Sequence, residues 1–280
     1  MTPPPHVSRL VLLGHPVAHS LSPAFQNAAL RAAGLAARYS ALDVAPSDLP
    51  DTLRALTAER AAGNVTVPHK EAAAGCCDRL AAVAARTGAV NTFWVDADGA
   101  LVGDNTDVEG FDRAASALLG SGRPSRVALL GAGGSARAVL AALSAWPGTT
   151  TALWSRSPQR ARAVAANEGD AAVRVVDDVG ACVEGAELVV NATPLGLGDG
   201  DPLPVAPAQL APGAAVLDLV YRPGETAWVR AAREAGHPAS DGLPMLLAQG
   251  ALAFERWFGR QPDPEVMWAA IGRRRPATTS

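Results

Sequence analysis

The chain has 280 residues, of which 49% are hydrophobic and 18% are charged, and its formal net charge is −3. This length fits two domains of ordinary size, and the composition is typical of a soluble globular protein. A nucleic-acid-binding surface would need a strongly basic face, which the net charge argues against. We expect no membrane span, because no apolar run of about 18 residues occurs, and no secretory signal, because residues 1–6 lack a basic and an apolar region.

The cysteines and histidines predict neither disulfides nor a metal site. The three cysteines are Cys76, Cys77 and Cys182, and none forms a C-x-x-C pair. An odd count without such spacing favours a reducing compartment, the cytoplasm. His15 and His19 are four residues apart, but nearby prolines argue against a shared helix and therefore against paired metal ligands.

In the N-terminal part of the chain, predicted strands alternate with predicted helices. Ser22 and Pro23 predict a helix in which Ser22 is the N-cap, and Gly34 closes it. A short helix begins near Lys70, after Pro68 ends a strand. The other predicted elements are strands at 9–13, 39–44 and 65–67 and a helix over 50–62. This alternation favours an α/β fold with a largely parallel sheet.

The remainder of the chain repeats this alternation. A turn at 96–99 and a helix over 108–119 lead to a linker at 120–124. Strands are then predicted at 127–130, 149–154, 172–176, 188–191 and 214–219, and helices over 135–145, 158–166, 245–258 and 264–272. The three arginines at 273–275 read as a solvated tail. The series of strands and helices from 127 onward is typical of a dinucleotide-binding domain.

A glycine-rich turn marks the candidate cofactor site. The pattern Gly131-x-Gly133-x-x-Ala136 follows a predicted strand and opens a predicted helix, which is the context that dinucleotide binding requires. Its glycines let backbone N–H groups approach a pyrophosphate, and the helix N-terminus adds partial positive charge. The candidate cofactor-binding residues here are Gly131, Ala132, Gly133, Gly134, Ser135 and Ala136.

The end of the next predicted strand favours NADP. An NAD site usually has an acidic residue there that binds the ribose hydroxyls. This chain has Ser155, Arg156 and Ser157 instead, with Arg160 one turn further on. Hydroxyl and guanidinium groups bind a 2′-phosphate, which an acid would repel.

Lys70 is the candidate proton-transfer residue. It is the only lysine among 24 basic residues, and a lysine can exchange a proton where an arginine cannot. It lies at the start of a predicted helix, where a cation opposes the helix dipole and is unfavourable for stability. Asp107 could hold the Lys70 amine, although it could also serve only as a helix cap.

Polar residues near other element ends suggest a substrate site. Ser20 and Ser22 precede a helix, where two hydroxyls can bind a carboxylate, although Ser22 could be only a cap. Amides also follow or end predicted strands, and such positions line the ligand crevice of α/β sheets. These amides are Asn64, Asn91, Asn105 and Asn191.

Across almost its whole length the sequence resembles the shikimate dehydrogenase family. The resemblance depends on several motifs in the family's order. They are Gly14-His-Pro-Val-Ala-His-Ser-Leu-Ser-Pro23, Asn64-Val-Thr-Val-Pro-His-Lys70, Gly88-Ala-Val-Asn-Thr92, Asn105-Thr-Asp107, Gly131-Ala-Gly-Gly-Ser-Ala-Arg137, Asn191-Ala-Thr-Pro-Leu-Gly196, Asp218-Leu-Val-Tyr-Arg-Pro223 and Gly242-Leu-Pro-Met-Leu-Leu-Ala-Gln-Gly250. The sequence departs from the family at Gln26, at Ser155-Arg156-Ser157 and at Pro194, where His, Asn-Arg-Thr and Ser are commoner.

The resemblance implies the reversible, NADPH-dependent reduction of 3-dehydroshikimate to shikimate, a step of chorismate and aromatic amino-acid biosynthesis. It implies that Lys70 and Asp107 form the catalytic pair and that no metal takes part. Ser20, Ser22 and Tyr221 match residues that hold the substrate carboxylate, and Thr66, Asn91 and Gln249 match residues that bind ring hydroxyls. Further cofactor contacts are implied at Asn191, Thr193 and Gly242.

The implied architecture has two α/β domains. Residues 1–107, completed by 243–280, form the substrate domain with a mainly parallel sheet, and residues 108–242 form a Rossmann-type NADP domain. The implied partners are small molecules, with no nucleic acid or membrane, and the protein is a monomer or homodimer. Two alternatives stay open: a broader-specificity enzyme that accepts quinate or NAD, and a non-catalytic sensor of NADPH or shikimate, which would have no need for the Lys70–Asp107 pair.

Overall fold

The computed structural model describes residues 7, 9–166, 173–198 and 200–274. The predictions that concern residues 1–6, Ala172 and Arg275 fall outside these ranges. Contacts between Cα atoms divide the chain into unit 1, Met1–Gly110 with Leu246–Ala277, and unit 2, Phe111–Met245 with Thr278–Ser280. Both units are α/β, so the predicted fold class is confirmed. None of the described helices is long and apolar enough to cross a membrane.

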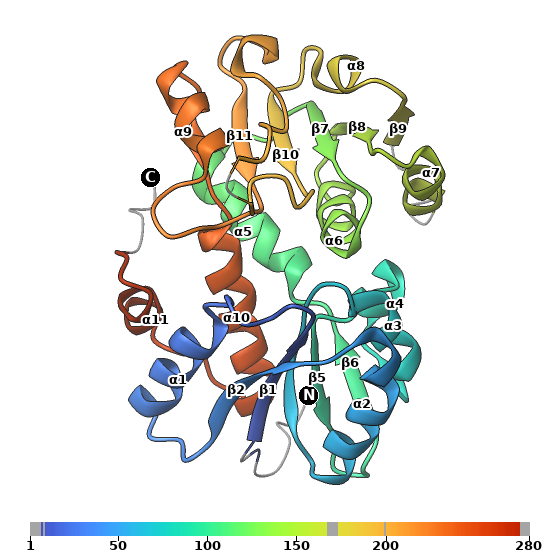
Figure 1. Ribbon diagram of the computed structural model, residues 1–280, viewed down its shortest axis with the longest axis vertical. Coiled ribbons are helices and arrows are strands. Elements are labelled where there is room, and N and C mark those ends of the chain that lie inside the picture. The colour runs from blue at the N-terminus through green and yellow to red at the C-terminus, as the bar shows by residue number, and fades with distance from the viewer. Residues whose placement is uncertain (1–6, 8, 167–172, 199, 275–280) are drawn as a thin grey trace. The chain divides into compact units, whose positions relative to one another are not determined.

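Unit 1 is built around a six-stranded sheet (Figure 1). Its strands are β1 (Arg9–Gly14), β2 (Arg38–Asp43), β3 (Ala62–Val65), β4 (Arg79–Leu80), β5 (Thr92–Val95) and β6 (Leu101–Asp104). Its helices are α1 (Ser22–Ala32), α2 (Leu49–Ala58), α3 (Lys70–Cys76), α4 (Ala82–Thr87) and α11 (Pro264–Ala270), with the 3-10 turn η1 (Pro46–Asp48). The division between the units falls within α5 (Asp107–Leu119) and α10 (Leu243–Phe258).

The strand order of unit 1 is β2-β1-β3-β5-β6-β4. β1, β2 and β3 are parallel, whereas β5 pairs antiparallel with both β3 and β6. Asn64 near the end of β3 therefore lies opposite Thr92 at the start of β5, and Thr92 lies opposite Asp104 at the end of β6. As a result, the carboxyl ends of β1, β3 and β6 and the amino end of β5 all lie at the same end of the sheet.

Helices cover both faces of this sheet. On one face, buried side chains of α2, α3 and α4 pack against alternate strand residues such as Val11, Leu13 and Phe93. Near the other face, α1 packs against α11. Each fully buried side chain of this size contributes about 1.5 to 3 kcal/mol of transfer free energy, so both layers hold the strand ends firmly in place.

Unit 2 has the strand order β12-β11-β10-β7-β8-β9, in which every pair is parallel. Its strands are β7 (Arg126–Leu130), β8 (Thr150–Trp154), β9 (Val173–Val176), β10 (Leu188–Asn191), β11 (Ala215–Asp218) and β12 (Ala239–Ser240). Its helices are α6 (Gly134–Leu143), α7 (Pro158–Ala166), α8 (Val179–Val183) and α9 (Ala227–Glu234), with the 3-10 turn η2 (Pro207–Gln209). This is the doubly wound order of dinucleotide-binding sheets, which reverses between β7 and β10.

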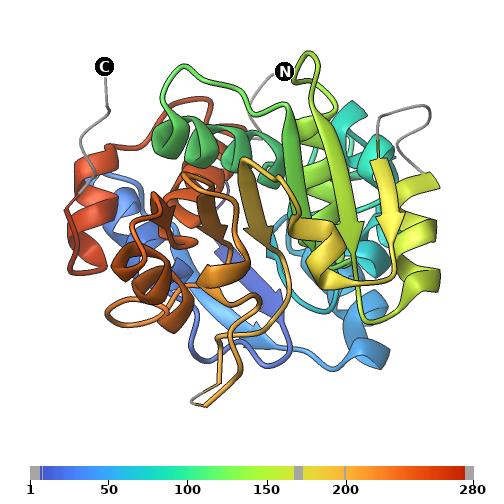
Figure 2. The same ribbon diagram turned by 90° about the horizontal axis from the view of Figure 1, so that it is seen from above.

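Helices α8 and α9 bury one face of the unit 2 sheet. Alternate residues of its strands, among them Leu130, Val189 and Val216, form a cluster with Cys182 of α8 and Trp228 of α9. Helix α7 packs against β8 and β9, and it lies beside β9 in both views (Figures 1 and 2). The sheet is therefore a rigid support for the loops that follow its strands.

Three local predictions were wrong. Ser22 is the first residue of α1 and not its N-cap, which is Leu21. The helix predicted over 50–62 ends at Ala58, because Arg60 has φ +53° and the N–H of Ala61 bonds the carbonyl of Leu56, a left-handed helix end. The strand predicted at 65–67 is β3, which spans Ala62–Val65.

The sequence did not predict several elements. These are α4, α8, α9, β4, β12 and the antiparallel pair β5 and β6, although the turn between β5 and β6 was predicted. Most are short, and a strand of two residues such as β4 has no alternation for a pattern to detect. The sheet of unit 1 is consequently mixed, with β5 antiparallel to both of its neighbours in an otherwise parallel sheet.

Candidate functional site

Lys70 and Asp107 form a part-buried ion pair in unit 1. Lys70 is the first residue of α3 and Asp107 is the first of α5. The Lys70 Nζ lies 2.7 Å from Asp107 Oδ2, and only 12% and 5% of the two side chains are exposed. Because both residues follow strands that end at the same sheet edge, the fold joins two sequence motifs that were predicted separately.

Asn91 connects this pair to its surroundings. Its Nδ2 donates to Asp107 Oδ1 at 2.8 Å and to Thr106 Oγ1 at 3.0 Å. Its Oδ1 accepts the backbone N–H of Thr106 at 2.7 Å. Its Nδ2 also lies 3.2 Å from Gln249 Oε1, which is the longest of these contacts. Asn91 therefore brings Asp107, Thr106 and Gln249 into one hydrogen-bonded cluster.

The loop before α5 is fixed by its own side chains. Asn105 Oδ1 accepts the N–H of Asp107 at 3.0 Å, and Asn105 Nδ2 donates to the carbonyl of Ala89 at 2.9 Å. Asp104 is buried and accepts from Arg256 Nε of α10 at 2.9 Å. The sequence did not predict this ion pair, since a separation of 152 positions leaves no periodic signal.

Gln249 is positioned by close packing of helices within unit 1. A Cβ on Gly110 would lie 2.8 Å from Gln249 Cβ, and a Cβ on Gly250 would lie 2.6 Å from the Phe25 ring. Gln26, at the position where the family more often has His, donates from Nε2 to the carbonyl of Gly250 at 2.9 Å. Two glycines thus allow α10 to bring Gln249 to Asn91.

Ser20, Ser22 and Thr66 lie on the segments that follow β1 and β3. Ser20 Oγ accepts the backbone N–H of Ser22 at 3.2 Å, so the two predicted carboxylate ligands are adjacent. The backbone N–H of Thr66 donates to the carbonyl of Leu13 at 2.8 Å. His69, which the sequence did not single out, is buried and bonds the carbonyl of Val44 at 2.7 Å, which anchors the residue before Lys70. In the described ranges, no three His, Cys, Asp or Glu side chains form a group that could hold a metal.

The predicted glycine turn of unit 2 lies where the strand order reverses. Gly131 follows β7 with φ +112°, and a Cβ there would lie 2.8 Å from the carbonyl oxygen of Ala192, which follows β10. The N-cap of α6 is Gly133, where an added Cβ would meet nothing within 4 Å. The first turn of α6 therefore offers its N–H groups at the position where this fold binds a pyrophosphate.

The segment that the sequence predicts to distinguish NADP from NAD follows β8. Ser155 and Ser157 are partly exposed, and Arg156 and Arg160 are exposed. Ser157 Oγ accepts the backbone N–H of Arg160 at 3.4 Å, and Ser155 Oγ accepts that of Ser157 at 3.4 Å. The two hydroxyls order the start of α7, and both guanidinium groups belong to the same short stretch.

Hydrogen bonds hold the Asn191 side chain to the loop after β10 and to the end of β11. This buried side chain donates to Asp218 Oδ1 at 2.8 Å and to the carbonyl of Leu195 at 3.1 Å, and it accepts from Thr193 Oγ1 at 2.6 Å. Asp218 also accepts from Thr226 Oγ1 at 2.8 Å. Burial raises the pKa of Asp218 to about 6. Asp218 begins the motif at 218–223, but its sequence context predicted no role for it.

The last two predicted ligands, Tyr221 and Gly242, lie in unit 2. Tyr221 is partly exposed on the segment after β11. Gly242 precedes α10, and a Cβ there would lie 2.3 Å from the carbonyl oxygen of Leu219. A side chain at this position would displace the loop after β11, which explains the glycine on packing grounds alone.

The strand order of unit 2 is typical of dinucleotide-binding domains, and the lysine of unit 1 can transfer a proton. Together these features fit a dinucleotide-dependent oxidoreductase. Family models for the shikimate dehydrogenase substrate-binding domain and for the shikimate 5′-dehydrogenase C-terminal domain match residues 12–93 and 242–271. A shikimate dehydrogenase (NADP(+)) from Methylocella silvestris is 45% identical, over 92% of this chain and 94% of its own. The chain belongs to the shikimate dehydrogenase family.

Solved structures agree with this assignment. Shikimate 5-dehydrogenase from Thermus thermophilus, in complex with NADP(H) and shikimate, matches with a TM-score of 0.82 and 40% identity over 94% of this chain and 98% of its own. Quinate dehydrogenase from Corynebacterium glutamicum, in complex with NAD, matches with a TM-score of 0.86 and 32% identity over 95% and 98%.

Proposed function

We propose that the protein is an NADP-dependent shikimate dehydrogenase, which reversibly reduces 3-dehydroshikimate to shikimate in aromatic amino-acid biosynthesis. The observation that carries this proposal is the 2.7 Å contact between Lys70 Nζ and Asp107 Oδ2. The Lys70 ammonium donates a proton to the carbonyl oxygen as negative charge develops there, and the neutral amine accepts a proton in the reverse direction. Asp107 positions Lys70 and accepts from a neighbouring substrate hydroxyl.

Residues of unit 2 fit NADP. The Gly131 turn has no room for a side chain, and Gly133 leaves the start of α6 open, as close approach to a pyrophosphate requires. Arg156 and Arg160, with Ser155 and Ser157, hold the 2′-phosphate. Residues 131–136, Asn191, Thr193 and Gly242 complete the proposed cofactor set. When bound, NADPH supplies the hydride.

The substrate is proposed to bind beside the Lys70–Asp107 pair. Ser20, Ser22 and Tyr221 hold its carboxylate, and Thr66, Asn91 and Gln249 bind its hydroxyls. Because every polar atom of the Asn91 side chain already has a partner, a substrate hydroxyl that bonds Asn91 replaces the 3.2 Å contact with Gln249. Gln249 is then free to bond the same ligand. Residues 1–107 with 243–280 serve as the substrate domain, and residues 108–242 as the NADP domain.

One candidate alternative is a broader-specificity enzyme that accepts quinate or NAD. It is favoured by the similarity to the Corynebacterium quinate dehydrogenase with bound NAD. The absence of an acidic residue at positions 155–157 favours NADP instead. We further propose that the enzyme works in the cytoplasm as a monomer or homodimer, which the mass in solution distinguishes.

The test is NADPH formation, followed by absorbance, with shikimate or quinate and with NADP or NAD. Turnover confined to shikimate with NADP supports the proposed enzyme. Comparable rates with quinate or NAD support the broader-specificity alternative. A folded protein that binds NADPH but turns over neither substrate overturns both and leaves a sensor.

A further inference from the structure

A cavity of about 440 Å³ opens in unit 2, away from the predicted cofactor residues. It is lined by the first residues of β7, β8 and β9 and by the segment around α8. The predicted NADP residues follow the carboxyl ends of β7, β8 and β10, so the cavity lies at the opposite end of the same sheet. Its volume falls within the range of about 300 to 1,000 Å³ that is usual for small-molecule sites.

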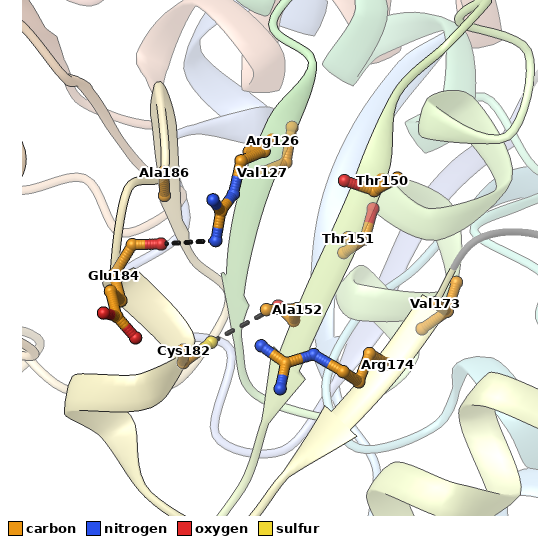
Figure 3. Close-up of a pocket in the computed structure, with 10 residues that line it drawn as sticks. All are labelled: Arg126, Val127, Thr150, Thr151, Ala152, Val173, Arg174, Cys182, Glu184 and Ala186. Atoms are coloured by element: carbon orange, nitrogen blue, oxygen red, sulfur yellow. Dashed lines mark hydrogen bonds between the residues drawn. The ribbon is translucent and has the colours of Figure 1, made fainter.

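Two guanidinium groups face this cavity. Arg126 extends from β7 and Arg174 from β9, and Figure 3 shows them on either side of the hydrogen bond between Cys182 and Ala152. Arg126 Nη2 donates to the backbone carbonyl of Glu184 at 3.0 Å, which fixes the direction of its guanidinium. Among the residues that the structure describes, neither arginine forms an ion pair with a carboxylate.

The other described groups around the cavity place no carboxylate in ion-pair contact with these guanidinium groups. Glu184 lines the cavity, but its carboxylate points away from Arg126 (Figure 3). Glu187 accepts hydrogen bonds from Ser125. Burial raises the pKa of the Cys182 thiol to about 12, so the sulfur stays protonated and uncharged. Two positive charges therefore share one concave surface, and no carboxylate of the described residues forms an ion pair with either.

We propose that this cavity is a second ligand site, which binds a small molecule bearing an oxyanion between Arg126 and Arg174. Guanidinium groups bind carboxylates and phosphates through paired, charge-assisted hydrogen bonds, and two of them on opposite sides of one cavity favour a ligand with two anionic oxygens or more. Phosphate esters and dicarboxylates share this chemistry. The site is independent of the proposed dehydrogenase reaction, because it uses none of the residues assigned to that reaction.

The experiment is calorimetric titration of the full-length protein with inorganic phosphate and, separately, with succinate. Saturating NADP is present, so that Arg156 and Arg160 do not compete for the anion. Arg174→Gln and Arg126→Gln each remove one cavity cation. Arg230→Gln, an exposed arginine of α9 in the same unit, is the matched control for the change in net charge.

We expect saturable binding whose Kd rises about tenfold or more in both cavity variants and stays unchanged in Arg230→Gln. Binding of phosphate alone identifies the ligand class as phosphate esters, and binding of succinate alone identifies it as carboxylates. Equal Kd values in Arg174→Gln and Arg230→Gln, or the lack of saturable binding of either anion, overturn the proposal. Both arginines are exposed, but Arg126 also holds the backbone carbonyl of Glu184, so Arg174→Gln supplies the result if Arg126→Gln does not fold.

Discussion

Gly131 and Ala192 approach so closely that a Cβ on Gly131 would lie 2.8 Å from the Ala192 carbonyl oxygen. The two residues follow β7 and β10, between which the strand order of unit 2 reverses. This approach, together with φ +112° at Gly131, makes a side chain at this position costly for folding. Gly133, two residues later, has φ −105° and open space around its Cα.

The two glycines are therefore expected to respond differently to alanine. Gly131→Ala lowers the free energy of unfolding by about 2 kcal/mol, because both backbone strain and the clash oppose it. Gly133→Ala changes the free energy of unfolding by less than about 0.5 kcal/mol, yet it raises the Kd for NADP about tenfold, since the new methyl group occupies the approach of the pyrophosphate. Urea unfolding and calorimetric titration measure the two effects, and wild-type NADP affinity in Gly133→Ala would contradict the proposed site.

Lys70→Arg is expected to lower kcat by about a hundredfold or more, because arginine keeps the positive charge but cannot transfer the proton. The Kd for NADP should stay the same, since Lys70 belongs to unit 1 and the proposed cofactor residues to unit 2. Steady-state rates and NADP titration of the same sample check both statements. Near-normal turnover would show that Lys70 supplies only charge.

Arg156→Ala is expected to weaken NADP by about tenfold to a hundredfold and to leave NAD almost unaffected, because only NADP carries the 2′-phosphate. Arg162→Ala is the matched control: Arg162 is an exposed arginine of α7, and its guanidinium lies 4.0 Å from Asp177 Oδ1. Titration of each variant with both cofactors gives the NADP-to-NAD ratio. Equal weakening of both cofactors in Arg156→Ala would assign the 2′-phosphate elsewhere.

Asp218 predicts a pH dependence of stability. Its pKa is raised from 3.8 to about 6 in the folded protein, so the folded state holds the proton more tightly than the unfolded state. Its contribution is therefore fully present below the unfolded pKa and is lost as the pH rises through about 6, to a limit of about 3 kcal/mol.

Asp218→Asn removes this titration. The wild type should thus lose unfolding free energy relative to the variant as the pH rises from about 4 to about 7. Urea unfolding across that range measures it, and the comparison cancels the other titrating groups. A difference that does not change with pH would mean that Asp218 titrates alike in the folded and unfolded chains.

The sequence predicted those parts of the fold whose signal is local. The helix at 158–166 and the strand at 188–191 have the predicted bounds. The helix predicted over 50–62 is too long, because nothing in the side chain of Arg60 indicates the left-handed backbone conformation that ends the helix. The β5–β6 pairing was missed because it depends on contact between strands and not on the composition of either strand.

The candidate site shows the same limit. Lys70, Asp107 and Asn91 were found from residue type and position, and the structure brings all three together. The Asp104–Arg256 pair fixes the end of β6, just before Asp107, but it could not be predicted from the sequence. The pairing arises only when α10 packs against the end of β6. Roles that depend on long-range packing need coordinates, whereas roles that depend on chemistry can be inferred from sequence.

The hydrogen bonds of Asn91 have one further consequence. A backbone N–H cannot accept a hydrogen bond, so the contact with Thr106 N–H fixes which end of the Asn91 amide is oxygen, and its nitrogen must face Asp107. The cluster is thus preorganised by folding. Its conformational entropy is already lost before any ligand arrives, and binding energy remains available to align the substrate with Lys70.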